Sequence, residues 1–169
     1  MTSTLTAATL TVKITESIDL NGKNQGGSTT LSLASINEIS KRIVTVTTTE
    51  ATILTFSSAI SQGTYVAANV KYIRFTNLDD TNHITLTFKN ENDDEFAVKL
   101  DKGQSFIYNG DISGGVVDTM DGIDGTGLTV SLADLVNVTA DADTASCDME
   151  IFVASAWLEG KWHQHIQQV

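Results

Sequence analysis

Hydrophobic and polar residues alternate along most of this chain. In residues 9–15, Leu10, Val12 and Ile14 fall on one side of an extended chain, while threonine and lysine fall on the other. Side chains of a β-strand point alternately to the two faces of a sheet, so this pattern predicts a strand with one buried face. The same alternation occurs in residues 29–33, 41–48, 52–56, 70–77, 83–89, 95–101, 104–109 and 149–159.

Short clusters of Gly, Asn and Asp separate these segments, for example residues 21–27, 90–94 and 101–103. Gly and Asn tolerate the positive φ angles of tight turns, and Asx side chains bond the local backbone. Many short strands with such turns predict an all-β protein, an antiparallel β-sandwich with the jelly roll as one form of it. Helix is expected for at most a turn or two in residues 34–42 and 130–138, and the second segment is equally compatible with a strand.

The alternation stops in residues 110–127, which hold six of the twelve glycines and four aspartates. A loop of this length is uncommon inside a compact domain and is often functional. We therefore expect an N-terminal arm (residues 1–9), one β-sandwich domain (residues 10–158) that contains this long Gly/Asp-rich loop, and a C-terminal tail (residues 159–169).

Composition narrows the range of partners. The chain has 169 residues, is 41% hydrophobic and carries a formal charge of -11, which suits one globular domain. Affinity for nucleic acid and for anionic membranes depends on clustered Lys and Arg, so neither partner is expected. The single cysteine, Cys147, excludes a disulfide framework and is expected to be a buried or half-buried small residue. The N-terminus lacks the pattern of a secretory signal, so folding in a reducing cytoplasm is expected.

The acidic residues near the fifth to seventh predicted strands have two interpretations. Asp79 and Asp80 precede one strand, and Asp93, Asp94 and Glu95 lie at the following turn. Carboxylates at such positions commonly stabilise turns, and this is the favoured interpretation. Catalysis by a pair of carboxylates is the alternative, because residues that meet only in space are invisible in the sequence.

Other chemistry has little support in the sequence. Asp118, Asp121 and Asp124 are the first candidates for a cation such as Ca²⁺, but their spacing matches no standard calcium loop, so no cofactor is expected. His163 and His165 are too few for a zinc site. Because the chain has no nucleophile elbow or phosphate-binding loop, an enzyme is not expected.

Carbohydrate binding stays open, because β-sandwiches host many lectins and sugar sites use exposed aromatic rings. The aromatic residues with some freedom to face outward are Tyr65, Tyr108, Trp157 and Trp162. A lectin-like module is therefore an alternative function.

Residues 73–111 carry a resemblance to a known group of proteins. A strand ending in the turn Thr76 to Asn82 is followed by a second strand and then by a third, Phe96 to Leu100. Gly103 and a strand with Ser105 and Phe106 come next. This arrangement resembles small β-rich virion structural proteins of tailed bacteriophages. The resemblance implies a structural subunit of a phage particle that forms homo-oligomers.

These observations together predict a phage virion structural protein. A capsid decoration or cement protein, which stabilises the head shell by contacts with the major capsid protein or other virion proteins, is preferred over a tail or fibre component. The contacts are expected from the N-terminal arm, the tail and the loop of residues 110–127. The residues proposed for partner contact are Trp157, Trp162, Ile166, Val116 and Val117.

Overall fold

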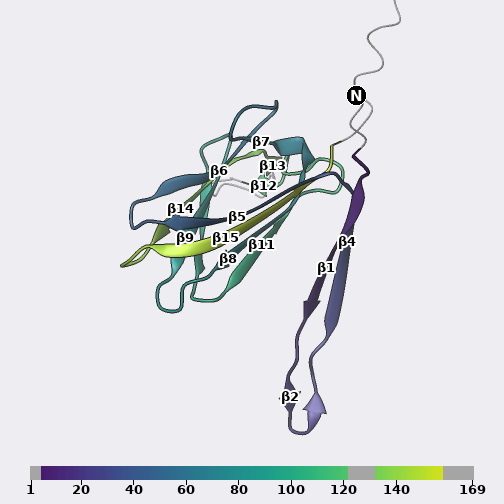
Figure 1. The fold of residues 1–169 in the computed structure, drawn as a ribbon, viewed down its shortest axis with the longest axis vertical. Helices are drawn as coiled ribbons and strands as arrows, with labels where there is room; N and C mark the ends of the chain where they lie inside the picture. Colours follow the sequence, from purple (N-terminus) through teal and green to yellow (C-terminus); the bar gives the residue numbers. More distant parts are fainter. Residues whose placement is uncertain (1–4, 122–131, 158–169) are drawn as a thin grey trace, which may run out of the picture.

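The computed structural model describes residues 5–121 and 132–157, which form several antiparallel sheets (Figure 1). The sheet order β10-β9-β14-β6-β7 contains Glu95–Leu100, Ile84–Asn90, Leu135–Ala142, Ala51–Ser57 and Tyr65–Val66 in turn. The sheet order β11-β8-β15-β5 contains Ser105–Asn109, Val70–Asn77, Cys147–Ser155 and Glu38–Val46. All pairings in these two sheets are antiparallel except β6 with β7. The all-β, sandwich-like prediction is confirmed.

The core lies between these two sheets and follows from the alternation of the sequence. On β9, Ile84, Leu86 and Phe88 are fully buried, while the residues between them are half-buried. Phe88 lies edge-on to Phe75 of β8, with ring centroids 5.8 Å apart, and stacks against Tyr108 of β11 at 5.3 Å. Aromatic pairs in such geometries add to the stabilisation from buried area.

The helical turn expected in residues 34–42 is wrong, and of the two alternatives for residues 130–138 the strand is confirmed where the segment is described. Residues 34–42 belong to β4 (Ser28–Ile36) and β5, and residues 132–138 belong to β13 (Leu132–Ala133) and β14. All nine residues of β5 pair with β15, so backbone pairing overrides the local propensity of this segment. Among the described residues, the one helical element is the 3₁₀ turn η1 (Ala67–Asn69).

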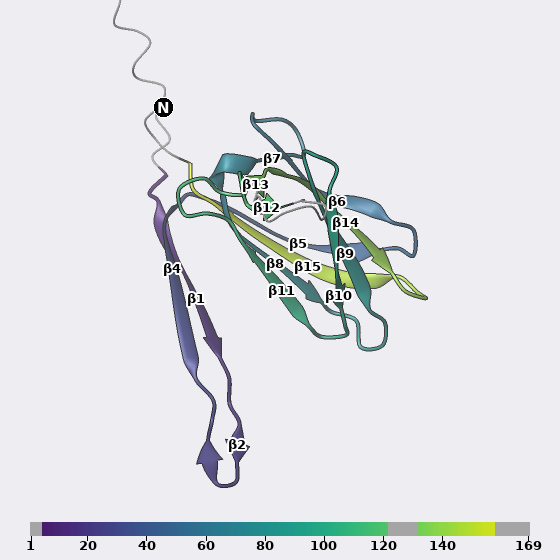
Figure 2. The same cartoon turned by 180° about the vertical axis from the view of Figure 1, so that it is seen from behind.

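Residues 8–36 form a separate ribbon, which we call the arm. It differs from the N-terminal arm of residues 1–9 that the sequence predicted. Strand β1 (Ala8–Thr15) pairs with β4 and with no other described strand, and β2 (Asp19–Leu20) pairs with β3 (Lys23–Asn24) near the far end. Figures 1 and 2 show the arm diverging from the sandwich from its base to its tip. The sandwich was predicted to begin at residue 10, so the placement of these strands is a correction. Their alternation predicted strands correctly but did not indicate which sheet they join.

The first half of the predicted long loop packs against the sandwich. Gly115 has a φ of 68°, and a Cβ there would lie 2.3 Å from the carbonyl oxygen of Ala67. The adjacent Val116 is fully buried and Val117 packs against the core, so Val116 is not available as the partner contact that was predicted. Strand β12 (Met120–Asp121) pairs with β13. The remaining residues of the predicted loop, 122–127, lie outside the described residues.

Candidate assembly surface

The arm has one apolar side and one polar side. Cross-strand neighbours of an antiparallel ribbon lie on the same face, so the register assigns each side. The apolar side contains the pairs Leu10–Leu33 and Val12–Leu31, and the polar side contains Thr11–Ser32, Lys13–Thr30 and Thr15–Ser28. An amphipathic ribbon of this kind needs another surface to cover its apolar side.

The base of the arm has such a cover within the chain. Leu33 and Ile36 are buried in a second hydrophobic cluster with Tyr72, Ala154 and Ala156. Tyr72 and the nearby Phe152 contact edge to face, with ring centroids 6.0 Å apart. This cluster lies on the side of the β11-β8-β15-β5 sheet that faces away from the core, which we call its outer face. It fixes the base of the arm to the sandwich.

Toward its tip the arm loses this cover. Ile14 is 46% exposed, Ile18 is 53% exposed and Leu20 is 58% exposed. A two-stranded ribbon on its own is at best marginally stable in water. The far half of the arm therefore exposes apolar side chains that a partner surface would bury.

A groove runs between β1 and the outer face. It encloses about 340 Å³ and is lined by residues 10–14 of the arm and by Tyr72, Arg74, Ile107 and Phe152. Most of this lining is apolar, and its two charged residues, Lys13 and Arg74, are both basic. The groove is therefore a basic, apolar surface on a chain whose formal charge is -11.

The edge strand β5 extends this surface. Ile39 and Ile43 are each 61% exposed, and they pair with Ala154 and Glu150 of β15. Strand β5 ends the sheet order, so one of its edges is unpaired within the described residues. Long edge strands with exposed apolar side chains favour pairing with another chain.

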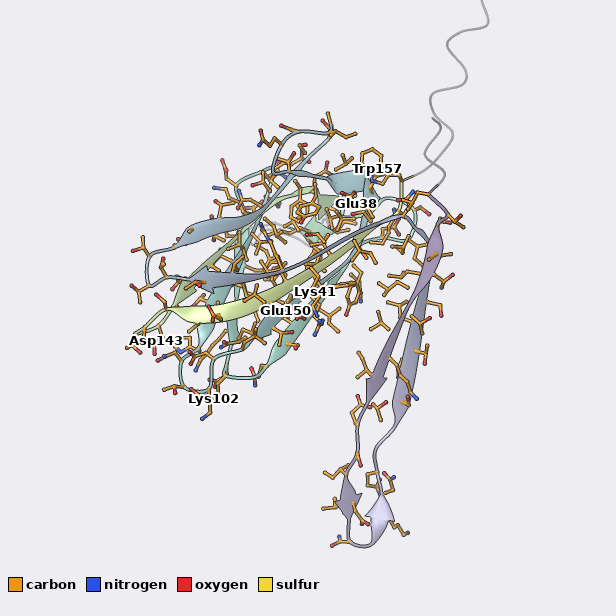
Figure 3. All side chains as sticks on the ribbon, in the orientation of Figure 1. Glu38, Lys41, Lys102, Asp143, Glu150 and Trp157 are labelled. Atoms are coloured by element: carbon orange, nitrogen blue, oxygen red, sulfur yellow. The ribbon has the colours of Figure 1, made fainter. Side chains whose placement is uncertain are left out.

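An ion-pair network lies on the outer face, between the groove and the edge strand β5. Glu150 lies 3.0 Å from the Nζ of Lys41 and 2.5 Å from the Nη2 of Arg74. Figure 3 labels Lys41 and Glu150 close together on adjacent strands. The hydrogen bond from Lys41, with the positive charges of Lys41 and Arg74, lowers the pKa of Glu150. The network keeps Arg74 in position on the groove wall.

Trp157, a predicted partner contact, lies where the arm joins β5 (Figure 3). Its indole Nε1 donates to Glu38 at 2.8 Å, and its backbone N–H donates to Asn37 Oδ1 at 2.9 Å. Trp157 is 36% exposed, so part of its ring remains accessible. Trp162 and Ile166, which were also predicted as partner contacts, lie outside the described residues.

Asx side chains stabilise both of the predicted acidic turns, and at Asp79 the favoured interpretation is confirmed. Asp79 Oδ1 accepts backbone hydrogen bonds from Thr81 at 2.8 Å and Asn82 at 2.6 Å, and these bonds lower the pKa of Asp79. Asn90 Oδ1 accepts bonds from the N–H groups of Asn92 and Asp94, both at 2.9 Å. These side chains replace backbone partners that the turns leave unsatisfied.

The residues suggested for a cation are only partly described. The backbone N–H of Asp118 donates to Asp134 Oδ1 at 3.0 Å, and Asp121 lies in β12. Asp124 lies outside the described residues, as do His163 and His165. Within residues 5–121 and 132–157, no group of three or more His, Cys, Asp or Glu residues is arranged to hold a metal ion.

Two of the aromatic residues suggested for sugar binding pack inward. Tyr108 stacks on Phe88 and donates a hydrogen bond from its hydroxyl to Thr119 Oγ1 at 3.0 Å, and burial raises its pKa. Tyr65 packs against Phe56, with ring centroids 6.2 Å apart. Cys147 is buried, as expected, and burial raises the pKa of its thiol.

Sequence reasoning missed the arm and the edge strand as a surface. One signal was present in residues 38–46, where Ile39 and Ile43 alternate with Ser40 and Arg42. The other face of the same strand carries Val44 and Val46, which pack in the core, so Ile39 and Ile43 face a different surface. The sequence had no comparable signal for the separation of the arm from the sandwich.

Comparisons with known proteins add little to this geometry. No protein-family model matches the chain, and no curated protein matches it. A solved structure described as "Bacillus endospore appendages form a novel family of disulfide-linked pili" is similar over 89% of this chain and 90% of that chain, with 8% identity and a TM-score of 0.40. At this level the similarity carries no functional inference. Among the described residues, no helix is long and apolar enough to cross a membrane.

Proposed function

We propose that this protein is a structural subunit of a tailed-phage virion that acts through protein–protein contacts, with head decoration preferred over a tail role. The observation that carries the proposal is the arm, whose apolar side is covered at the base and exposed at Ile14, Ile18 and Leu20. Burial of such side chains against a partner drives association, because stabilisation scales with the apolar area removed from water.

The phage setting rests on the sequence of residues 73–111, and the geometry supports the more general role of an assembly subunit. Ile39 and Ile43 on an edge strand add a second adhesive element beside the arm. Subunits of stable assemblies use interfaces with apolar centres and polar rims. The groove, with apolar walls and basic residues at its margin, has this composition.

The lectin-like alternative has less support. Tyr65 and Tyr108 pack against core phenylalanines, and the indole N–H of Trp157 bonds Glu38. Of these aromatic residues, Trp157 alone is exposed among the described residues, while Tyr65 and Tyr108 are half-buried, so the three rings do not form a shared platform. A carbohydrate array is the direct test of this alternative.

The virion proposal is tested by mass spectrometry of gradient-purified phage particles from the source of this sequence. We expect this chain in the particle band, at a fixed ratio to the major capsid protein. Separating heads from tails before analysis then tests the preferred location, since the chain is expected with the heads. Particles that lack the chain would overturn the proposal, and a chain confined to tails would overturn the head assignment.

A further inference from the structure

We infer that the groove between the arm and the outer face receives the tip of the arm from a second copy of this chain. This inference rests on the proposed function, because it gives the assembly subunit a specific self-contact. The arm of each copy provides the inserted element, and the groove with β5 provides the acceptor surface. The three steps that follow concern shape, apolar matching and charge.

The groove suits a few side chains. Its volume is about 340 Å³, and apolar side chains make up most of its lining. Ile18 and Leu20 lie near the arm tip and are more than half exposed, so they are free to enter such a space. Displacing water from apolar walls by apolar side chains is favourable.

The apolar surfaces match beyond the groove itself. Ile39 and Ile43 lie on β5 next to Phe152 and the groove wall, and each is 61% exposed. Ile14 is exposed on the apolar side of the arm before the tip. The arm of a second copy, laid along the outer face, would cover Ile39 and Ile43 of β5. The outer face would at the same time cover the apolar side of that arm.

The net charges of the two surfaces are opposite. Toward the tip of the arm, Glu16 and Asp19 outnumber Lys23. On the groove side, Lys13, Arg74 and Lys41 outnumber Glu150, which forms ion pairs with Arg74 and Lys41. Complementary charges of this kind orient two chains and disfavour wrong partners. A second copy is the partner favoured here because this chain carries both the acidic apolar tip and the basic apolar groove.

Such a contact joins two different patches, so each copy has one free arm and one free groove. Contacts of this type close into rings or extend into filaments, depending on the rotation between copies. This property allows a mixing experiment in which one copy lacks a functional arm tip and the other lacks a functional acceptor surface.

The arm variant is Ile18→Asp with Leu20→Asp, and the acceptor variant is Ile39→Asp with Ile43→Asp. All four side chains are more than half exposed, so folding should be retained, and circular dichroism checks this. The matched control is Ser61→Asp with Gln62→Asp, two exposed positions between β6 and β7 that lie outside the arm, the groove and β5. Full-length proteins are measured by sedimentation velocity over a range of concentrations.

We expect the wild-type chain and the control to self-associate, and each test variant to weaken self-association at least tenfold. Mixing the two test variants should give a 1:1 complex, because one intact arm tip and one intact acceptor surface remain. Both test variants associating like the wild type, or a wild-type chain that stays monomeric at all concentrations, would overturn the inference. The virion proposal would survive either result if the chain were present in particles.

Two further variants keep the inference testable if an aspartate variant fails to fold. Asp19→Lys and Lys13→Glu should each weaken self-association, and mixing them should restore it through the reversed pair. Removal of residues 158–169 is expected to leave self-association intact. If this removal abolished association while the arm variant retained it, the tail would be the inserted element and the inference would be wrong.

Discussion

The sandwich and the arm are built from the same alternating pattern, yet they bury it to different degrees. Leu86 on β9 is fully buried by the opposing sheet, whereas Ile14 on β1 is 46% exposed. The difference lies in what faces each strand: a second sheet covers β9, while the arm has a neighbour only at its base. Alternation therefore indicates that a strand has an apolar side, and the tertiary structure determines whether the same chain covers it.

The largest effect is expected from Phe88→Ala in the sandwich. Phe88 is fully buried and contacts Phe75, Phe96, Phe106 and Tyr108, so its removal should leave a cavity in the core. The free energy of unfolding should fall by about 3–5 kcal/mol, measured by urea denaturation. A loss below about 1 kcal/mol would contradict the assignment of the core to this cluster.

Leu33→Ala tests the base of the arm, where the two regions meet. Leu33 is 6% exposed within the second cluster, so the substitution should cost about 2–3 kcal/mol of local packing. Amide hydrogens of β1 and β4 should exchange faster, while those of β9 should change little. Equal loss of protection in both regions would show that the arm and the sandwich unfold as one unit.

A pair of glycines sharpens the same comparison. A Cβ on Gly115 would lie 2.3 Å from the carbonyl oxygen of Ala67, and a Cβ on Gly26 would lie 2.1 Å from that of Glu16 in the arm. Gly115→Ala should lower the stability of the sandwich by about 1–3 kcal/mol, because its positive φ also strains any side chain. Gly26→Ala should distort the arm and leave the melting temperature of the sandwich nearly unchanged.

Gly103→Ala is the control for these variants, because its φ is 69° but no atom lies within 4 Å of the added Cβ. Gly103→Ala should lower the free energy of unfolding by about 1 kcal/mol, because only the strain of the positive φ is added. Melting temperatures measured by calorimetry rank the three variants. A Gly115→Ala protein as stable as Gly103→Ala would contradict the close approach of the loop to η1.

The smallest effect in this series is a loss of stability in acid. Backbone hydrogen bonds lower the pKa values of Asp79, Asp101 and Asp111 in the folded protein, and Lys41 lowers that of Glu150. Their contribution is present above the unfolded pKa values, near 4, and is lost as pH falls through the folded values. Melting temperatures should therefore drop below about pH 4, and Asp79→Asn should weaken this dependence. A melting temperature that rises as the pH falls below about 4 would contradict this prediction.

The fold was predictable from the sequence as far as local pattern determines it. Most strands, including β9 with Ile84, Leu86 and Phe88, follow from alternation, and the turn at Asp79 follows from Asx chemistry. The arm was not predictable, because Leu10 and Leu86 have the same local context of alternation. Val116 was assigned to the surface because its glycine-rich surroundings indicate a loop, but the close packing of Gly115 against Ala67 buries it.

The most direct test of the account is amide hydrogen exchange of the arm compared with the sandwich at low and high protein concentration. At low concentration we expect β1 and β4 to exchange quickly outside the buried base, while β8, β9 and β15 exchange slowly. At high concentration the arm should become protected, because a second copy covers it. Arm amides that are as protected as those of β9 at low concentration, or that stay unprotected at every concentration, would contradict the account.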